Sequence, residues 1–110
     1  EYLLPTLVQG VDGALVGFAS LIPDYITNLY RAVCDGDLKE AQAIQGKINI
    51  LKEVVYSTGE PSSDAHARMK VAMNLCGRMN SNTVRPPTEL PTGETYDAIV
   101  AAVKEVGLMA

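Results

Sequence analysis

The stretch "GALVGFA" at residues 13–19 decides the fold of this 110-residue chain. It is a continuous apolar run between turn signals, and such a short run, apolar on both faces, is typical of a buried parallel strand. Gly13 and Gly17 thin out its side chains, which would let another group approach closely. No second strong strand candidate is present. The backbone N–H and C=O groups of this strand would therefore need ladder partners that these residues do not supply.

Helical patterns flank the predicted strand. Residues 2–9 predict a short helix that Gly10 ends. After the strand, Ser20 is a candidate N-cap and Pro23 falls in the first turn of a second helix, which runs to Gly36. The strand therefore lies between two helices.

Three more helices follow. Asp37, with Glu40 three residues on, predicts a capped third helix that runs to about Tyr56 and stops before Gly59. A linker over residues 60–63 precedes the fourth helix.

The fourth and fifth helices are separated by a proline-rich stretch. Ser63 or Asp64 caps the fourth helix, and Gly77 closes it. Residues 78–91 predict an irregular crossing or loop, and Thr92 caps the last helix. The chain by itself is therefore mostly α.

The composition argues against two classes of partner. The net charge is −4 and the pI about 4.8, with 47% hydrophobic residues. Nucleic-acid binding selects clustered Lys and Arg, and no basic stripe is present for nucleic acid or an anionic membrane.

Cys34 and Cys76 are interpreted as buried free thiols of a cytoplasmic protein. The start at Glu1, inside an amphipathic pattern, suggests a missing upstream segment, although processing would look the same.

Several stretches resemble one enzyme family. Residues 10–23, "GVDGALVGFASLIP", resemble the last barrel strand of the dihydrodipicolinate synthase / N-acetylneuraminate lyase family. Residues 30–45, "YRAVCDGDLKEAQAIQ", resemble the helix, Gly-Asp turn and Ala-rich helix that follow it. Lys70, the "VRPP" at residues 84–87 and the "VGL" at residues 106–108 resemble later family positions. The resemblance covers essentially the whole chain, although Ser20 stands where the family usually has Asn.

The resemblance implies an α/β fold, the C-terminal part of a (β/α)8 TIM barrel. Residues 1–36 would be the seventh helix, eighth strand and eighth helix, and residues 37–110 a C-terminal extension of three helices. The ladder partners of residues 13–19 would be the first and seventh strands, both upstream.

The resemblance also implies part of a Schiff-base-forming lyase, aldolase or dehydratase acting on pyruvate or other 2-oxo acids. It implies no cofactor or metal, and commonly a homotetramer. The catalytic Lys and Tyr would lie upstream, so no catalytic residue is expected in this chain. Its five lysines lie on helix faces that look solvated, whereas an imine-forming lysine needs desolvation. The alternative is a catalytically inactive, stand-alone helical interaction module.

Three positions match substrate-contacting positions of the family. Glu1 matches a carboxylate that contacts substrate hydroxyls, and its alternative is a helix-start Glu stabilised by the helix dipole. The backbone C=O of Leu15 matches a carbonyl that lines the pyruvate pocket, and otherwise it is an ordinary ladder acceptor. Gly17 matches a small residue at the substrate face, with strand packing as the alternative. His66 has no second metal ligand at helical spacing.

Overall fold

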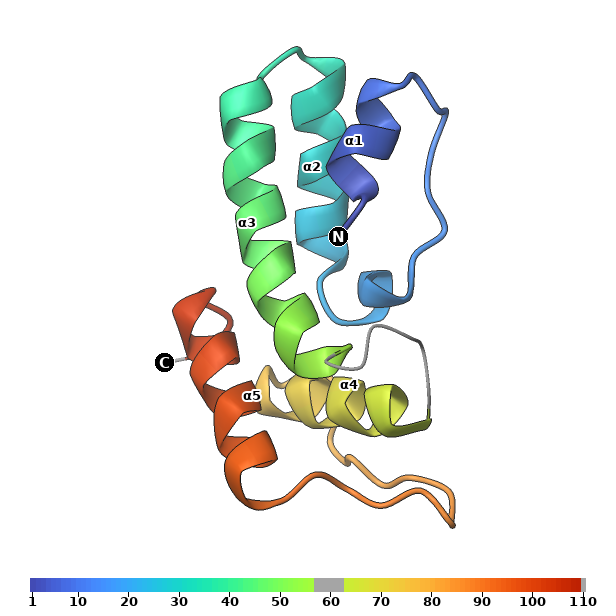
Figure 1. The fold of residues 1–110 in the computed structure, drawn as a ribbon, viewed down its shortest axis with the longest axis vertical. Coiled ribbons are helices and arrows are strands. Elements are labelled where there is room, and N and C mark those ends of the chain that lie inside the picture. The colour runs from blue at the N-terminus through green and yellow to red at the C-terminus, as the bar shows by residue number, and fades with distance from the viewer. Residues whose placement is uncertain (57–62, 110) are drawn as a thin grey trace. The chain divides into compact units, whose positions relative to one another are not determined.

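The computed structural model describes residues 1–56 and 63–109. The predicted stop at Gly59 and most of the predicted linker lie outside these residues. Packing divides the chain into two compact units, Glu1–Asn49 and Ile50–Ala110. The regular elements of the described chain are all helical (Figure 1): α1 (Leu3–Val8), the short 3-10 helix η1 (Gly17–Ser20), α2 (Pro23–Cys34), α3 (Leu38–Val55), α4 (Ser63–Leu75) and α5 (Gly93–Glu105).

The strand predicted over residues 13–19 does not form in this chain. Val16 has extended backbone angles (φ −131°, ψ 139°), but the described residues supply no strand that could pair with it. Residues 17–19 depart further, because Gly17–Ser20 close into η1. A strand is stable only when a neighbour pairs with its N–H and C=O groups. The predicted strand is therefore wrong for these residues taken alone.

The entry into α2 differs from the prediction. Ser20 lies in η1, and Ile22 holds the N-cap position without a side-chain hydrogen bond. Ile22 N–H donates to Phe18 O at 2.8 Å, and Ile26 N–H donates to Ile22 O at 3.1 Å. Backbone bonds thus lead directly from η1 into α2, with Pro23 in its first turn. The N-cap role predicted for Ser20 is wrong because η1 takes up that residue.

The turn between α2 and α3 forms as predicted. Gly36 adopts φ +75°, and its N–H donates to Val33 O at 3.1 Å. Asp37 N–H donates to Ala32 O at 2.8 Å, which completes a Schellman motif. Asp37 Oδ1 then accepts the Glu40 N–H at 3.0 Å and caps α3. The two helices consequently run in opposite directions (Figure 1).

The first unit packs α1 and η1 against α2. Its buried apolar side chains come from all four helical elements: Leu3, Leu7, Phe18, Leu21, Ile22, Leu29, Ala32, Ala41, Ile44 and Ile48. The burial predicted for Cys34 is wrong, because Cys34 is exposed at the last residue of α2. Leu38, which opens α3, is 50% exposed.

The second unit packs α4 against α5. The apolar side of α5 is buried at Ile99 and Val103 and at Val106, which follows the helix, whereas Tyr96 is 38% exposed. Residues 78–91 are irregular, as predicted. Lys70 Nζ donates to Thr83 O at 2.8 Å and so ties this crossing to α4.

Candidate functional site

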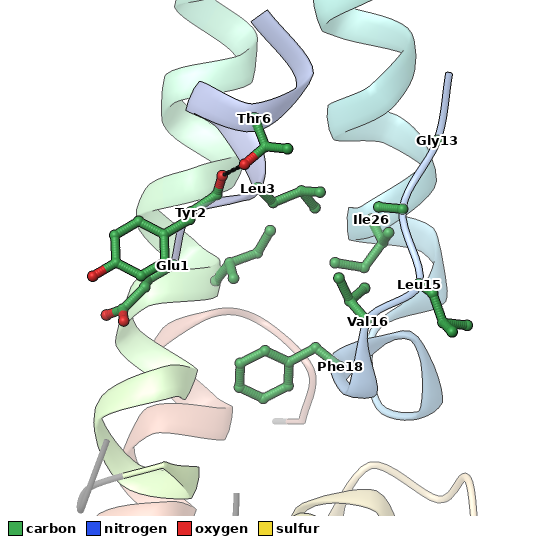
Figure 2. Close-up of a pocket in the computed structure, with 11 residues that line it drawn as sticks. Glu1, Tyr2, Leu3, Thr6, Gly13, Leu15, Val16, Phe18 and Ile26 are labelled. Carbon is green, nitrogen blue, oxygen red and sulfur yellow. Dashed lines mark hydrogen bonds between the residues drawn. The ribbon is translucent and has the colours of Figure 1, made fainter. Parts of the chain in front are cut away.

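An apolar cavity of about 410 Å³ lies in the first unit (Figure 2). It is bounded by the start of α1, the extended residues before η1, and single residues of η1, α2 and α3. The lining residues are Glu1, Tyr2, Leu3, Thr6, Gly13, Ala14, Leu15, Val16, Phe18, Ile26 and Ile48. Its polar side chains all come from the start of α1, so any polar recognition at this cavity would depend on that turn.

The structure brings two of the three candidate site residues to this cavity. Glu1 and Leu15 both line it, although Glu1 precedes α1 and Leu15 lies in the connection that follows α1. Gly17 is not among the lining residues, but both of its chain neighbours, Val16 and Phe18, are. Two of the three positions predicted from the resemblance thus line one cavity, and the third does not.

Side chains alternate along the extended residues. Val16 and Phe18 turn toward the cavity, whereas Leu15 turns away from it (Figure 2). Phe18 is 6% exposed and Leu15 is 104% exposed. Opposite directions of neighbouring side chains are the geometry of a strand, and of Leu15 and Val16 it is Val16 that faces the helices of this unit. The odd-numbered side, with Gly13 and Leu15, faces away from them.

Gln45 is a buried polar residue that the sequence reasoning missed. It lies on α3, is 7% exposed, and its Oε1 accepts the Leu4 N–H at 2.9 Å. The signal was its place on the buried stripe of α3, four residues after Ala41 and three before Ile48. A polar side chain at such a position needs a partner, and here that partner is the first turn of α1.

None of the five lysines lines the cavity. Lys70 is engaged with Thr83 O, and Lys47 Nζ lies 5.5 Å from the centre of the Tyr25 ring. Lys52 Nζ lies 3.4 Å from Glu53 Oε1. All five lie on helices, as predicted.

Tyr30 lies beside the extended residues, on α2. Its hydroxyl donates to Asp12 O at 3.3 Å. Interaction with Cys34, one helical turn away, raises the pKa of the Tyr30 hydroxyl. The bond to Asp12 O ties the residues before η1 to α2.

The described residues contain neither a metal-binding cluster nor a helix that could cross a membrane. Within residues 1–56 and 63–109, no group of three or more His, Cys, Asp or Glu side chains could hold a metal ion. No helix in that part of the chain is both long enough and apolar enough to cross a membrane.

Comparison with known proteins identifies relatives along nearly the whole chain. A "DapA-like lyase" of uncharacterised function from Thermofilum pendens is 28% identical over 109 residues, which cover 98% of this chain and 35% of the relative. A 4-hydroxy-tetrahydrodipicolinate synthase from Methanococcoides burtonii is 28% identical over 96% of this chain and 34% of its own length. The enzyme of that name from Campylobacter curvus is 27% identical over 91% of this chain.

The chain spans about a third of the length of these relatives. This coverage is consistent with the C-terminal segment that the resemblance implied. The family model for the dihydrodipicolinate synthetase family matches residues 1–106. Because the match extends over nearly all of the 110 residues, the chain belongs to the dihydrodipicolinate synthetase family.

Proposed function

We propose that these residues are the C-terminal part of a Schiff-base-forming lyase, aldolase or dehydratase that acts on pyruvate or another 2-oxo acid. Residues 1–36 supply the seventh helix, eighth strand and eighth helix of a TIM barrel, and residues 37–110 its helical extension. The imine-forming Lys and its assisting Tyr come from the upstream part. The family match over residues 1–106 and the lyase and synthase names of the relatives support this proposal.

The complete exposure of Leu15 is the observation that carries the proposal. A barrel strand is buried on both faces, one against the outer helices and one against the barrel interior. Val16 is half-buried and turned toward the helices of this unit, so on this proposal the side of Leu15 is the one that faces the interior. Pairing with the seventh and first strands then satisfies the backbone and buries Leu15.

On this proposal, the strand direction brings Gly17 and the Leu15 carbonyl near the substrate. Active sites of TIM barrels lie at the C-terminal ends of the strands, and the extended residues end where Gly17 opens η1. The start of α1 follows the preceding strand, so Glu1 also lies at this end. Glu1 binds substrate hydroxyls, and the Leu15 C=O lines the 2-oxo acid pocket.

In the proposed reaction, the neutral lysine amine adds to the ketone carbon of the 2-oxo acid, and water leaves. The resulting imine accepts the electron pair when the carbon–carbon bond next to it breaks or when a proton leaves that carbon, which gives an enamine; in the bond-forming direction the enamine donates the same pair to the aldehyde carbon. Hydrolysis returns the lysine and the product. This reaction uses no metal or cofactor, and the proposed enzyme is a cytoplasmic homotetramer.

Borohydride reduction in the presence of pyruvate tests the proposal on the polypeptide as the cell makes it. The expected result is a stable pyruvate adduct on a lysine outside residues 1–110, located by peptide mass spectrometry. Complete absence of an adduct, or an adduct on Lys39, Lys47, Lys52, Lys70 or Lys104, would contradict it.

The alternative function is a stand-alone helical interaction module without activity. The well-packed helices of each unit are the observation that favours it. A module predicts a cooperative thermal melt for the isolated 110 residues. An enzyme segment predicts a poorly cooperative, self-associating chain, because strand edges and barrel-facing apolar surface are bare.

A further inference from the structure

We propose that Gln45 is a positioning residue, which fixes the first turn of α1 and with it the place of Glu1 at the edge of the cavity. This inference rests on the proposed function, because the contact between Glu1 and substrate hydroxyls is part of that function. Through Glu1, a residue of α3 in the helical extension would thus influence substrate recognition.

Gln45 supplies the cap that α1 lacks. The first amides of a helix have no acceptor within the helix, and Tyr2, at the N-cap position of α1, makes no side-chain capping bond. Gln45 Oε1 accepts the Leu4 N–H at 2.9 Å from a position 41 residues further along the chain. The start of α1 is therefore held from outside, by a side chain of α3.

The carboxamide of Gln45 is fixed in one orientation. Its Nε2 donates to Asn49 Oδ1 at 2.8 Å, so its oxygen is the atom directed at Leu4. A carboxamide that is 7% exposed and loses a partner leaves a buried polar group unsatisfied. The pair of bonds thus gives the first turn of α1 one preferred place.

The turn transmits this placement to Glu1. The carbonyl of Tyr2 accepts the Thr6 N–H at 3.1 Å and the Thr6 hydroxyl at 2.7 Å. Tyr2 is therefore locked to the turn that Gln45 holds. Glu1 directly precedes Tyr2 and lines the same cavity (Figure 2). Without the bond to Leu4, the turn is expected to fray, and Glu1 then loses the place beside the cavity that its bonded neighbour Tyr2 gives it.

The test compares two aldehydes in pyruvate condensation by the polypeptide as the cell makes it. D-glyceraldehyde carries hydroxyls that Glu1 can bind, and propionaldehyde carries none. Gln45→Met is expected to raise the KM for D-glyceraldehyde about tenfold, with kcat, the KM for propionaldehyde and pyruvate trapping unchanged. Gln45→Glu keeps an acceptor for Leu4 and is expected to restore the low KM.

Two further variants complete the comparison. Gln42→Met makes the same change at an exposed position of α3 and is expected to leave both KM values unchanged. Glu1→Gln is expected to raise the KM for D-glyceraldehyde as Gln45→Met does, and the double variant to add nothing, because Gln45 acts through Glu1.

The outcomes separate this proposal from the one on which it depends. If wild-type protein forms no pyruvate adduct, the proposed function and the role of Gln45 both fail. If the adduct forms but Gln45→Met leaves the KM for D-glyceraldehyde unchanged, the positioning role alone is overturned. It is also overturned if the variant raises both aldehyde KM values equally, since that is the behaviour of a residue with only a structural role.

Discussion

Arg68 of α4 donates from Nε to the carbonyl of Val55, the last residue of α3, at 2.8 Å. Arg68 is 9% exposed and Val55 is fully buried. Within the described residues, the Nη2 atom of Arg68 is buried and makes no hydrogen bond. The guanidinium thus satisfies the end of α3 at the cost of burying an unused donor.

The first prediction concerns this bond. Arg68→Met removes the donor to Val55 O while keeping a long side chain, and is expected to lower the free energy of unfolding by about 2 kcal/mol. Arg85→Met removes an exposed arginine of the same unit and is expected to change it by less than about 0.5 kcal/mol. Urea unfolding followed by circular dichroism measures both. Equal stabilities of the two variants would show that the bond contributes nothing.

Two glycines on either side of the α3 start are expected to respond to alanine with opposite signs. Gly36 has φ +75°, where a Cβ is strained, so Gly36→Ala is expected to destabilise by about 1 kcal/mol. Gly46 lies inside α3, and an added Cβ would meet no atom within 4 Å. Gly46→Ala is therefore expected to stabilise by about 0.8 kcal/mol. Thermal melts of the pair check the signs, and a stabilising Gly36→Ala would refute the turn geometry.

Asp37 should behave as an N-cap. Asp37→Ala removes the acceptor for the Glu40 N–H and is expected to cost about 1 kcal/mol, whereas Asp37→Ser keeps an acceptor and should cost less. Asp35→Ala, two residues earlier and exposed, is the control. The denaturant midpoints of the three variants measure these changes in stability. If Asp35→Ala lowered the stability as much as Asp37→Ala, the lost charge rather than the lost cap would be responsible.

Leu15 gives a direct measure of the proposed barrel. Leu15→Ala is expected to be neutral in the isolated 110 residues, where the side chain is fully exposed. In the polypeptide as the cell makes it, the same change should cost about 2–5 kcal/mol, because it opens a gap in the barrel interior. Unfolding of both proteins with and without the substitution provides the comparison, and a neutral effect in both would remove the main support for the buried strand.

The two cysteines should differ in reactivity. Cys34 is exposed, whereas Cys76 is half-buried, and burial raises the pKa of the Cys76 thiol. The thiolate is the reactive form, so iodoacetamide at neutral pH should label Cys34 first. Because the folded pKa of Cys76 is raised, its folded form keeps its proton as the pH rises past the unfolded pKa. Its labelling should therefore accelerate only at a higher pH, which peptide mass spectrometry over a pH series would reveal.

Local chemistry explains why much of the helical structure was predictable. Gly36 and Gly77 end helices because their positive φ closes a turn that depends only on neighbouring residues. Asp37 caps α3 for the same reason, since its acceptor and the Glu40 amide are three residues apart. The family also followed from the order of such motifs along the chain. Patterns of neighbouring residues therefore predicted the ends of α2 and α4, the start of α3 and the family.

Non-local contacts decided the rest. Residues 13–16 alternate in the manner of a strand, but a strand exists only through a ladder to another segment, so these residues stay unpaired here. The burial of Gln45 depends on Leu4, and the cavity joins residues of α1, α2 and α3. Pairing, burial and cavity shape arise between segments that are distant in the sequence, which is why only the tertiary structure could decide them.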